Sequence, residues 1–346
     1  MKSSELMPRK ISEWTGKGAL ILSGLLLISL SCCYLFKPDF FAVITFYPAW
    51  TWTISGLFLA ALGLLANKRV SLIAMLVWLV FVAMFSEEPR SLCRSVLFCK
   101  GWGTITKKQN AIRVISLNCA GGNLKAAEEV IRYKPDIVLL QEAPTRKDVE
   151  GLARDLFKDN GTVIWNIDTA VIVRGHASQN ISPHKTNMFM TQTHVRLMSG
   201  IEASVISVHL FPPTIDMNLF SPDCWQKHKE DRQLRRSQIE KIVAQLDSIP
   251  ENVPVIVGGD FNTTADDGAI RLLGPRLRDS FREGGIGWGH TAFNNMPLFR
   301  VDQIWINKHF KPLAVFSKRT EHSDHRMVIC DLRPKLQTVA TDSFTK

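Results

Sequence analysis

The stretch "PVIVGGDFNTT", residues 254–264, decides the fold class. Three β-branched residues lead into two glycines, and Asp260 and Asn262 follow two positions apart. A short apolar run that ends at glycine is typical of a buried strand. A carboxylate and an amide at the end of such a strand either close an Asx-turn or belong to a polar site at the rim of a sheet. The other strands of the chain decide between these two interpretations.

Short apolar runs rich in β-branched residues recur from residue 111 onward. Residues 112–117 and 136–140 predict two strands, and residues 123–134 between them have the pattern of an amphipathic helix. Because helices are mixed with consecutive strands, we expect an α+β or mixed α/β domain with packed sheets. The further predicted elements are strands at residues 169–174, 193–197, 200–210, 255–257, 301–306, 312–316 and 326–332, and a helix at residues 231–246.

Polar residues stand at the ends of these runs, where side chains emerge at the rim of a sheet. Asn118, Glu142 and His209 follow strands, Asp302 opens one, and "HSDHR" at residues 322–326 precedes the last one. Each residue taken singly has an ordinary explanation, such as a turn, a helix start or a histidine at the edge of the core. Six strand ends that carry this set of side chains instead predict one shared site.

The residue types suit the hydrolysis of a phosphoester. A hard cation that neutralises the phosphate needs oxygen ligands such as Glu142. A carboxylate such as Asp260 can align and deprotonate water, and Asp302 can fix the tautomer and charge of His325. A serine nucleophile is not supported, because the chain has no G-x-S-x-G elbow. Donors for the charge that develops on the phosphoryl oxygens are Asn118, Asn262, His209 and His325.

Six motifs in the right order resemble those of the endonuclease/exonuclease/phosphatase superfamily, the DNase I-like proteins, and in particular its membrane-associated bacterial members. They are "SLNCAGGN" (116–123), "LLQEAP" (139–144), "ISVHLFPP" (206–213), "VGGDFNTT" (257–264), "FRVDQIWI" (299–306) and "HSDHRMV" (322–328). The resemblance covers about residues 111–333, which is essentially the whole soluble part. The GDFN and SDHR motifs are the most specific of the six.

The resemblance implies a four-layer αββα sandwich, in which two mixed sheets pack face to face between helices. It also implies an Mg²⁺ or Mn²⁺ ion at one rim, with Glu142 and Asp324 as the residues on the metal side. Asp260 matches the aspartate that orients or deprotonates the attacking water. By the same motif matches, the catalytic residues are Asp260, His325, His209, Asp302, Asn262 and Asn118.

Two features bear on the substrate. Family members that repair abasic DNA or cleave tyrosyl-DNA bonds usually carry an acidic residue two positions after the motif asparagine, where this chain has Ala120. This departure argues against those branches and favours a single-metal arrangement. Trp288 and Phe293, in the loop before Asp302, are candidates for contact with a base or a lipid, and the packing of a rim loop is the alternative.

The first 86 residues contain three charge-free apolar runs, at residues 19–36, 40–67 and 70–86. Since about 20 apolar residues cross a bilayer as a helix, we expect spans at about residues 19–36, 44–66 and 70–86. A cleaved signal peptide is the alternative for the first run. Lysine and arginine are concentrated before the first run and between the second and third. This distribution predicts an inside N-terminus and an extracytoplasmic catalytic domain, whereas the domain is cytoplasmic if the third run does not span.

The charge distribution bears on partners, and the apolar runs bear on how the chain is divided. The net charge of +10 suits a phosphate-rich partner such as nucleic acid or anionic lipid headgroups, and solubility together with attraction to a membrane surface is the alternative. Arg232, Arg235 and Arg236 are expected on a solvated face of the helix at residues 231–246, with a phosphate site as the alternative. The expected parts are a basic segment (1–18), an integral, multi-pass transmembrane region (19–86), a linker (87–110), the catalytic domain (111–335) and a tail (336–346).

The seven cysteines are too few for a disulfide scaffold. Cys93 and Cys99 are spaced for a small loop-closing disulfide if they lie on an oxidising side, and two free thiols are the alternative. Cys119, Cys224 and Cys330 are scattered along the chain and are expected to be buried.

Three functions remain as hypotheses. The first is a membrane-anchored, metal-dependent phosphodiesterase or nuclease that acts on nucleic acid or nucleotides, with the bilayer as a partner through the N-terminal helices and no obligate protein partner. The second is a lipid phosphodiesterase or phosphatase of the sphingomyelinase kind, although the soluble domain shows no obvious exposed apolar hairpin for entry into lipid. The third is an inactive membrane scaffold, against which the intact set of site residues argues.

Overall fold

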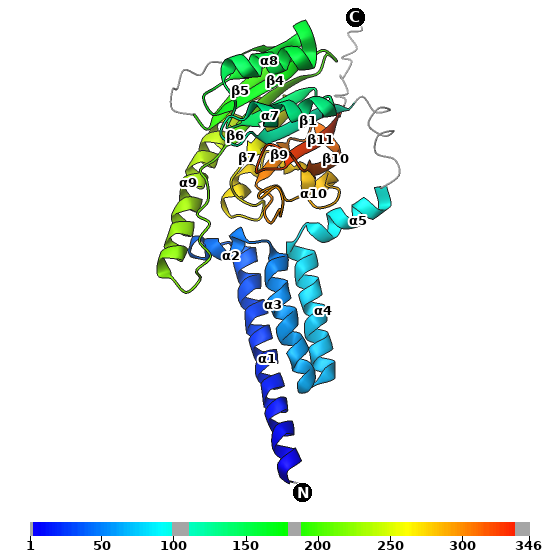
Figure 1. Ribbon diagram of the computed structural model, residues 1–346, viewed down its shortest axis with the longest axis vertical. Coiled ribbons are helices and arrows are strands. Elements are labelled where there is room, and N and C mark those ends of the chain that lie inside the picture. The colour runs from blue at the N-terminus through cyan, green and yellow to red at the C-terminus, as the bar shows by residue number, and fades with distance from the viewer. Residues whose placement is uncertain (1–2, 99–110, 179–187, 336–346) are drawn as a thin grey trace, which may run out of the picture. The chain divides into compact units, whose positions relative to one another are not determined.

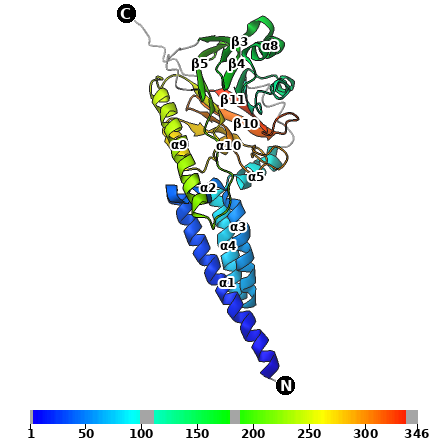
Figure 2. The same cartoon turned by 60° about the vertical axis from the view of Figure 1, so that its left-hand side comes forward.

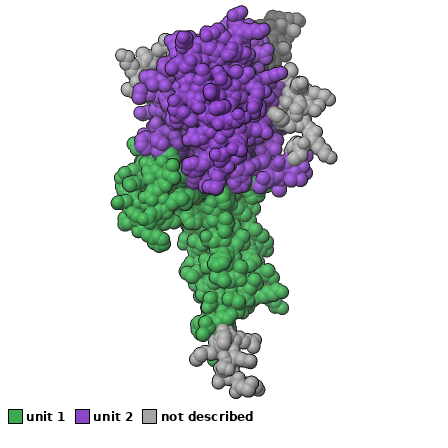
Figure 3. Space-filling view, viewed as in Figure 1, with its two compact units in different colours: residues 1–90, 213–236, 266–271 green, residues 91–212, 237–265, 272–346 purple. Residues whose placement is uncertain are grey.

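The computed structural model describes residues 3–98, 111–178 and 188–335 of the chain. The chain forms two compact units whose segments alternate along the sequence (Figure 3). The helical unit contains Met1–Arg90, Pro213–Arg236 and Asp266–Arg271. The sheet unit contains Ser91–Pro212, Ser237–Ala265 and Leu272–Lys346.

The sheet unit is built on one mixed, eleven-stranded sheet that folds over on itself. The strand order is β10-β11-β1-β2-β4-β5-β6-β7-β9-β8, and β3 pairs with β4 off this path. The strands are β1 (Ile112–Asn118), β2 (Ile137–Gln141), β3 (Gly161–Trp165), β4 (Thr169–Ser178), β5 (Met190–Leu197), β6 (Glu202–His209), β7 (Val255–Asp260), β8 (Arg278–Asp279), β9 (Asp302–Ile306), β10 (Phe310–Lys318) and β11 (Met327–Pro334).

Strand β4 joins the two halves of this sheet. Its first part pairs with β2 up to Val173, and from Gly175 onward it pairs with β5. Gly175 has φ +142°, and a Cβ at this position would lie 2.2 Å from the carbonyl oxygen of Arg196. Only glycine fits this bend, and the bend turns one half of the sheet over the other.

The two halves pack face to face around a shared apolar core. One core cluster contains Val114 and Leu139 from the first half and Val205, Ile256 and Ile304 from the second. Fully burying one such side chain contributes about 1.5–3 kcal/mol. The side chains of alternate strand positions therefore point between the halves, as the period of two requires.

Helices cover the outer faces. A second cluster packs Leu117 and Leu140 of the first half against Val149 and Leu152 of α8 (Arg146–Phe157). The other helices of this unit are α7 (Leu124–Glu128), α10 (Ser280–Gly284), α5 (Glu88–Phe98), which begins in the helical unit, and the second part of α9 (Pro222–Asp247), with Ile239, Ile242 and Leu246 buried. The predicted αββα sandwich is confirmed.

The helical unit holds the apolar N-terminal helices (Figure 1). Two of them, at Lys10–Phe36 and Lys68–Phe85, are long and apolar enough to cross a membrane. The second predicted span is broken, because Asp39–Phe46 and Ala49–Leu65 are bent by 80° relative to each other. Pro48 at the break has no N–H and cannot continue a helix. The elements are α1 (Ser3–Phe36), η1 (Asp39–Phe41), α2 (Ala42–Phe46), α3 (Ala49–Leu62), η2 (Gly63–Leu65) and α4 (Lys68–Phe85).

A buried arginine fixes the first part of α9 within this unit. Arg232 is 0% exposed and its Nε donates to Asp267 at 3.0 Å. Its terminal nitrogens donate to main-chain carbonyls and a hydroxyl near the end of α1 and in α2, those of Lys37, Pro38, Ala42 and Thr45. The prediction of a solvated arginine face is therefore wrong, since Arg235 is buried as well and Arg236 pairs with Asp39. In both ribbon views the first part of α9 lies beside α2 (Figures 1 and 2).

Part of the predicted linker is helical. In α5, Arg94 donates to the carbonyl oxygens of Phe281 and Gly285 at 3.3 and 2.8 Å. Cys93 is an exposed free thiol, and Cys99 lies outside the described residues, so their disulfide stays a prediction. The predicted contiguous domain, residues 111–335, also stays a proposal, and it differs from the compact sheet unit at residues 213–236 and 266–271. Burial of Cys119, Cys224 and Cys330 is confirmed.

Candidate active site

Strand alternation brings the predicted polar residues to one rim of the sandwich. In β1, Asn118 shares the inner face with Val114, and in β6, His209 shares it with Val205. In β7, Asp260 lies on the inner face with Ile256. The apolar members of each series fill the core, and the last member of each emerges at the rim.

The strand register then places these last members opposite one another. His209 and Asp260 are paired across the parallel strands β6 and β7. Asp260 and Asp302 are paired across the antiparallel strands β7 and β9. An antiparallel strand begins at the rim where its neighbour ends. The first residue of β9, Asp302, therefore lies at the same rim as the last residue of β7, Asp260.

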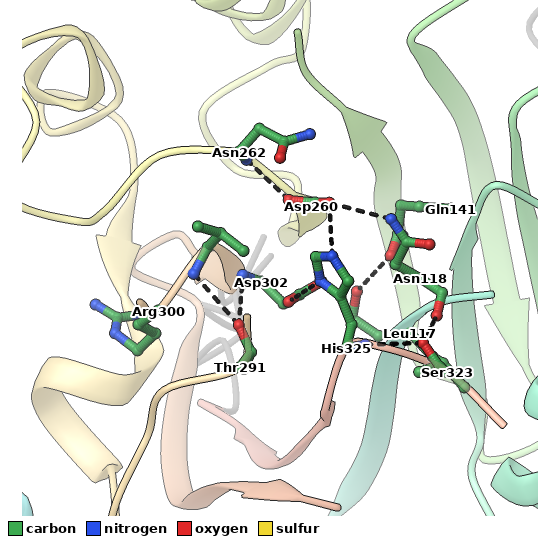
Figure 4. A network of polar contacts seen from close by, with 12 residues as sticks. Leu117, Asn118, Gln141, Asp260, Asn262, Thr291, Arg300, Asp302, Ser323 and His325 are labelled. Atoms are coloured by element: carbon green, nitrogen blue, oxygen red, sulfur yellow. Dashed lines mark hydrogen bonds and ion pairs between the residues drawn. The ribbon is translucent and has the colours of Figure 1, made fainter. Parts of the chain in front are cut away.

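Asp260 is the centre of the site and is 1% exposed. Its Oδ2 accepts a hydrogen bond from Asn118 Nδ2 at 3.1 Å, and Figure 4 shows Asn118 and His325 directed toward it. The same oxygen lies 3.9 Å from Nε2 of His209 and 3.9 Å from Nε2 of His325. These two gaps exceed hydrogen-bond length, so each imidazole faces Asp260 without closing on it.

Each of the two histidines is held from behind by a second carboxylate. Nδ1 of His325 lies 2.8 Å from Asp302 Oδ2, and Nδ1 of His209 lies 2.8 Å from Asp168 Oδ2. A carboxylate at Nδ1 fixes the ring orientation and keeps a proton on that nitrogen. Two Asp–His pairs therefore flank one buried aspartate.

The electrostatics follow from this packing. Burial disfavours the His325 cation, but the charges of Asp302 and Asp260 outweigh burial and raise the pKa of His325 to about 10. Burial is likewise outweighed at His209, whose pKa is raised by Asp168 and Asp260. The pKa of Asp260 is raised, first by its burial and then by the charge of Asp302. At neutral pH His325 is therefore a cation that can donate from Nε2.

Asn118 links Asp260 to a second carboxylate. Its Nδ2 also donates to Glu142 Oε1 at 3.0 Å, and Glu142 Oε2 accepts from the Gly121 N–H. Within the described residues, Oδ1 of Asp302 is buried and has no hydrogen-bond partner. Carboxylate and amide oxygens are the donors that a hard divalent cation prefers. The side chains on this rim therefore fit a divalent metal ion.

Three ligand atoms of Asp260, Asp302 and His325 also lie within 4.8 Å of one another. A metal between these three would have to displace the 2.8 Å hydrogen bond between His325 and Asp302. The Glu142 side of Asp260 requires no loss of an Asp–His hydrogen bond, because among the described residues the oxygens of Glu142 accept from an amide and a main-chain N–H. The metal side at Glu142 is therefore the better fit.

The backbone is strained where the site residues leave their strands. Glu142 and Asn262 have φ of +44° and +49°, and Ala120, two residues after Asn118, has φ +48°. Such left-handed conformations are uncommon outside glycine and persist where the surrounding structure enforces them. In β7, a Cβ on Gly259 would lie 1.9 Å from the carbonyl oxygen of Val208. The double glycine before Asp260 therefore allows β6 and β7 to approach.

Two hydroxyls hold the loops that carry the site residues. Oγ of Ser323 donates to the Asn118 carbonyl at 2.7 Å and accepts from the His325 N–H at 3.0 Å. Oγ1 of Thr291 accepts from the Asp302 N–H at 3.1 Å (Figure 4). Ser323 is buried and serves this structural role, in line with the absence of a nucleophile motif.

Asn262 and Asp324 differ from the other predicted site residues in the partners of their side chains. Asn262 donates its main-chain N–H to Asp260 Oδ1 at 2.8 Å, but its side-chain Nδ2 donates to the Leu210 carbonyl at 2.8 Å. Asp324 is exposed, and within the described residues its carboxylate has no hydrogen-bond partner. It lines a cleft of about 700 Å³ together with Phe293, Asn294, Asn295, Arg319, Thr320, Glu321 and Ser323.

Sequence reasoning missed Asp168 as well as the buried Gln141. Asp168 directly precedes β4, and Thr169 of β4 pairs with Gln141 at the end of β2. Its signal was a carboxylate just before a strand, as at Asp302. Gln141 Nε2 donates to Ser207 at 3.0 Å, and thus joins the two halves of the sheet below the rim.

The fold and this arrangement define a phosphoester-hydrolysing enzyme built on an αββα sandwich. The chain belongs to the Endonuclease/Exonuclease/phosphatase family, whose model matches residues 115–325, more than half of the chain. Members of this family generally use divalent metals.

Solved structures of other proteins are similar to this chain, and one of them shares its fold at a TM-score above 0.5. An endonuclease/exonuclease/phosphatase from Bacteroides vulgatus has a TM-score of 0.51 and 14% identity, covering 65% of this chain and 99% of that chain. D. rerio TDP2 humanized by 14 mutations has a TM-score of 0.47 and 19% identity over 64% and 98% of the two chains. The human Nocturnin catalytic domain with bound sulfate has a TM-score of 0.47 and 17% identity over 66% and 96%. Among curated proteins, none matches this chain.

Proposed function

We propose that this enzyme is a membrane-anchored, divalent-metal-dependent phosphodiesterase that hydrolyses its substrate by attack of water. One observation carries the proposal: Asp260 Oδ2 lies 3.9 Å from Nε2 of both His209 and His325. A water or a phosphoryl oxygen that lies beside each pair can contact the carboxylate and the imidazole at the same time. Nucleic acid or nucleotides are the proposed substrates.

The roles follow from the charges at the rim. Asp260 accepts a hydrogen bond from the attacking water and takes its proton, a role that its raised pKa assists. His325, kept cationic by Asp302, donates from Nε2 to a phosphoryl or leaving oxygen. His209, held through Nδ1 by Asp168, donates from Nε2 to a phosphoryl oxygen as the second imidazole that faces Asp260. These groups are fixed before substrate arrives, which avoids reorganisation during reaction.

Asn118 and Glu142 form the proposed metal side, with Asp324 as a further candidate ligand. A bound Mg²⁺ or Mn²⁺ would supply positive charge that neutralises the phosphate. Asn118 positions the carboxylates of Glu142 and Asp260 on either side of one amide nitrogen. Asn262 orients Asp260 through its main-chain N–H, and its remaining amide hydrogen is the proposed donor to phosphate.

The membrane anchor is proposed from the N-terminal helices. Lys10–Phe36 and Lys68–Phe85 are apolar enough to span a bilayer, and the bent pair between them supplies a third crossing if it acts as one span. With three crossings, the distribution of lysine and arginine supports a catalytic part outside the cytoplasm. A protease-accessibility test on intact cells checks this orientation, and digestion only after lysis would overturn it.

A lipid phosphodiesterase is the second candidate. The observation that favours it is a run of exposed apolar side chains shortly after β6, at Ile215, Met217 and Phe220. Substrate at a bilayer surface would then be reached by an enzyme anchored in the same bilayer.

The test is hydrolysis by the full-length protein in nanodiscs, with Mg²⁺, Mn²⁺ or chelator. The substrates are DNA, RNA, a generic phosphodiester, a phosphomonoester and sphingomyelin. We expect metal-dependent cleavage of the diesters and little cleavage of the monoester. Cleavage of sphingomyelin alone would favour the lipid phosphodiesterase.

Matched variants separate the site from the fold. His325→Ala should abolish cleavage, whereas His176→Ala, which removes an exposed histidine of β4, should leave it unchanged. If the wild type cleaves none of these substrates, or if His325→Ala keeps full activity, the proposal fails.

A further inference from the structure

The segment that connects β6 to α9 belongs to the helical unit from Pro213 onward. We call residues 213–225, which include the first turn of α9, the apolar loop. The sequence shows no obvious exposed apolar hairpin in the soluble domain, and the apolar loop, which lies in the helical unit and is not a hairpin, nevertheless carries exposed apolar side chains. Phe220 is 99% exposed, Ile215 is 65% exposed and Met217 is 61% exposed.

Several polar groups of the apolar loop form hydrogen bonds with the chain that follows it or within the loop. The Thr214 N–H donates to Asp231 Oδ2 at 2.6 Å, and the Asp216 carbonyl lies 2.8 Å from His228 Nε2. The indole N–H of Trp225 donates to the Leu219 carbonyl at 2.9 Å. The bonds to Asp231 and His228 tie the loop to the following turns of α9.

The apolar side chains of the same loop point outward. Ile215, Met217 and Phe220 are exposed, whereas Thr214 and Asp216 beside them are partly buried. Asn218 is exposed as well, so three apolar side chains face solvent within six residues beside one polar side chain. An ordered apolar cluster of this kind on a protein surface marks a contact with another apolar body.

The apolar loop continues the apolar surface at the end of α1. The ring of Trp225 stacks on Phe40 with centroids 5.6 Å apart, and it meets Phe41 edge-on at 5.7 Å. Phe36 at the end of α1 is 73% exposed and Phe40 is 60% exposed. Aromatic rings gather in this way where a membrane-spanning helix leaves the hydrocarbon for the headgroup layer.

We propose that the apolar loop is a membrane-interface segment, in which Ile215, Met217 and Phe220 insert into the headgroup and upper acyl region beside the end of α1. The occupant is lipid rather than a second protein because the loop shares one compact unit with helices apolar enough to cross a bilayer. Residues 213–231 carry four acidic and two basic side chains. Attachment therefore depends on apolar insertion and not on attraction to anionic lipids.

Arg232 helps to hold the apolar loop beside the end of α1. It joins α9, a few residues after the apolar loop, to the carbonyls of Lys37, Pro38 and Ala42 at the end of α1 and in α2. The contact of Trp225 with Phe40 keeps the loop next to the end of α1, so insertion needs no separate recruitment to the bilayer.

The test compares two exposed methionines. Met217 lies in the apolar loop, and Met198, 57% exposed, lies in the turn between β5 and β6. Each is replaced, as Met217→Cys or Met198→Cys, in the full-length chain with Cys32, Cys93 and Cys99 changed to serine. An NBD fluorophore is attached, with one protein copy per phosphatidylcholine nanodisc. A probe about 5–10 Å below the headgroup boundary should be quenched about twofold by shallow doxyl lipid.

We expect quenching and a blue-shifted emission at residue 217 and neither at residue 198, unchanged between low and high salt. An unquenched probe at 217, or equal quenching at both positions, overturns the proposal. A blue shift at 217 that requires two copies per disc assigns the loop to a second copy and overturns it too. Photo-crosslinking of the unsubstituted chain to a lipid headgroup probe should label the peptide that contains residues 213–225, and labelling only elsewhere contradicts the proposal. None of these outcomes depends on phosphoesterase activity.

Discussion

Asp260 and Arg232 are both buried charges, at 1% and 0% exposure, but their surroundings differ. Arg232 donates to a carboxylate, three carbonyls and a hydroxyl, so its guanidinium is saturated. Asp260 faces two imidazoles at 3.9 Å, and its neighbour Asp302 keeps one oxygen unpartnered within the described residues. A saturated buried charge stabilises structure, whereas an incompletely partnered one is held ready for a substrate.

The largest expected effect tests the Asp260 half of this comparison. Asp260→Asn removes the acceptor for the water proton, so we expect turnover to fall about 10²–10⁴-fold. The free energy of unfolding should not fall, because the substitution also removes the repulsion between Asp260 and Asp302. Turnover of the full-length protein and its thermal unfolding are the measurements. Asp155→Asn, at an exposed position of α8, is the control, and equal activities of the two variants contradict the assignment.

The Arg232 half predicts the opposite pattern. Arg232→Met leaves Asp267 buried without its partner, and breaking such a pair costs about 3–5 kcal/mol. Thermal unfolding in nanodiscs should detect the loss, while turnover per folded molecule stays within a few-fold of the wild type. Arg154→Met, at an exposed position of α8, should leave stability unchanged. An Arg232→Met protein of normal stability would show that the saturated contacts contribute little.

The dependence of turnover on pH tests the two Asp–His pairs. If His325 acts as a cation, turnover declines as the pH rises through its pKa of about 10. It also declines at low pH, where Asp260 becomes protonated and can no longer take the water proton. Asp302→Asn removes the charge that raises the pKa of His325, so the decline should move to lower pH. The measurement is the pH profile of kcat, and Asp159→Asn, an exposed substitution, should not move it. An unshifted profile in Asp302→Asn would contradict the role of this pair.

The smallest effect is expected at Asp168. Its side chain is 31% exposed, compared with 0% for Asp302, so solvent screens its interaction with His209. We expect Asp168→Asn to reduce turnover about 5-fold, corresponding to about 1 kcal/mol. Kinetics of this variant beside Asp302→Asn would rank the two pairs. A larger loss at Asp168 than at Asp302 would reverse their proposed importance.

The site could be predicted from the sequence because it repeats one simple relation. A strand that buries alternate apolar side chains must present its last inward residue at the rim, as Asn118, His209 and Asp260 do. Asp168 followed the same relation at the start of a strand but stood in no recognised motif. The helix α8 was also missed, although Thr145 caps it and Val149 and Leu152 have helical spacing.

The position of Arg232 could not be predicted, for a physical reason. Helical periodicity reports which side of α9 is polar, and Arg232, Arg235 and Arg236 do form a polar side. It does not report that carbonyls at residues 37–42, about 190 positions earlier, cover that side. The break at Pro48 was visible in the sequence, but the charge-free run around it was interpreted as one span.

Because the two units interleave along the sequence, proteolysis between α4 and β1 would divide the helical unit. Proteolytic release between α4 and β1 would remove the carbonyls of Lys37, Pro38 and Ala42 but leave Arg232 in the released part. The freed fragment would expose the Arg232 guanidinium without its carbonyl partners. It would also expose the ring of Trp225, which Phe40 and Phe41 had covered. Such a fragment would be prone to aggregate, so cleavage after the proposed membrane anchor should inactivate the protein and not release an active soluble form.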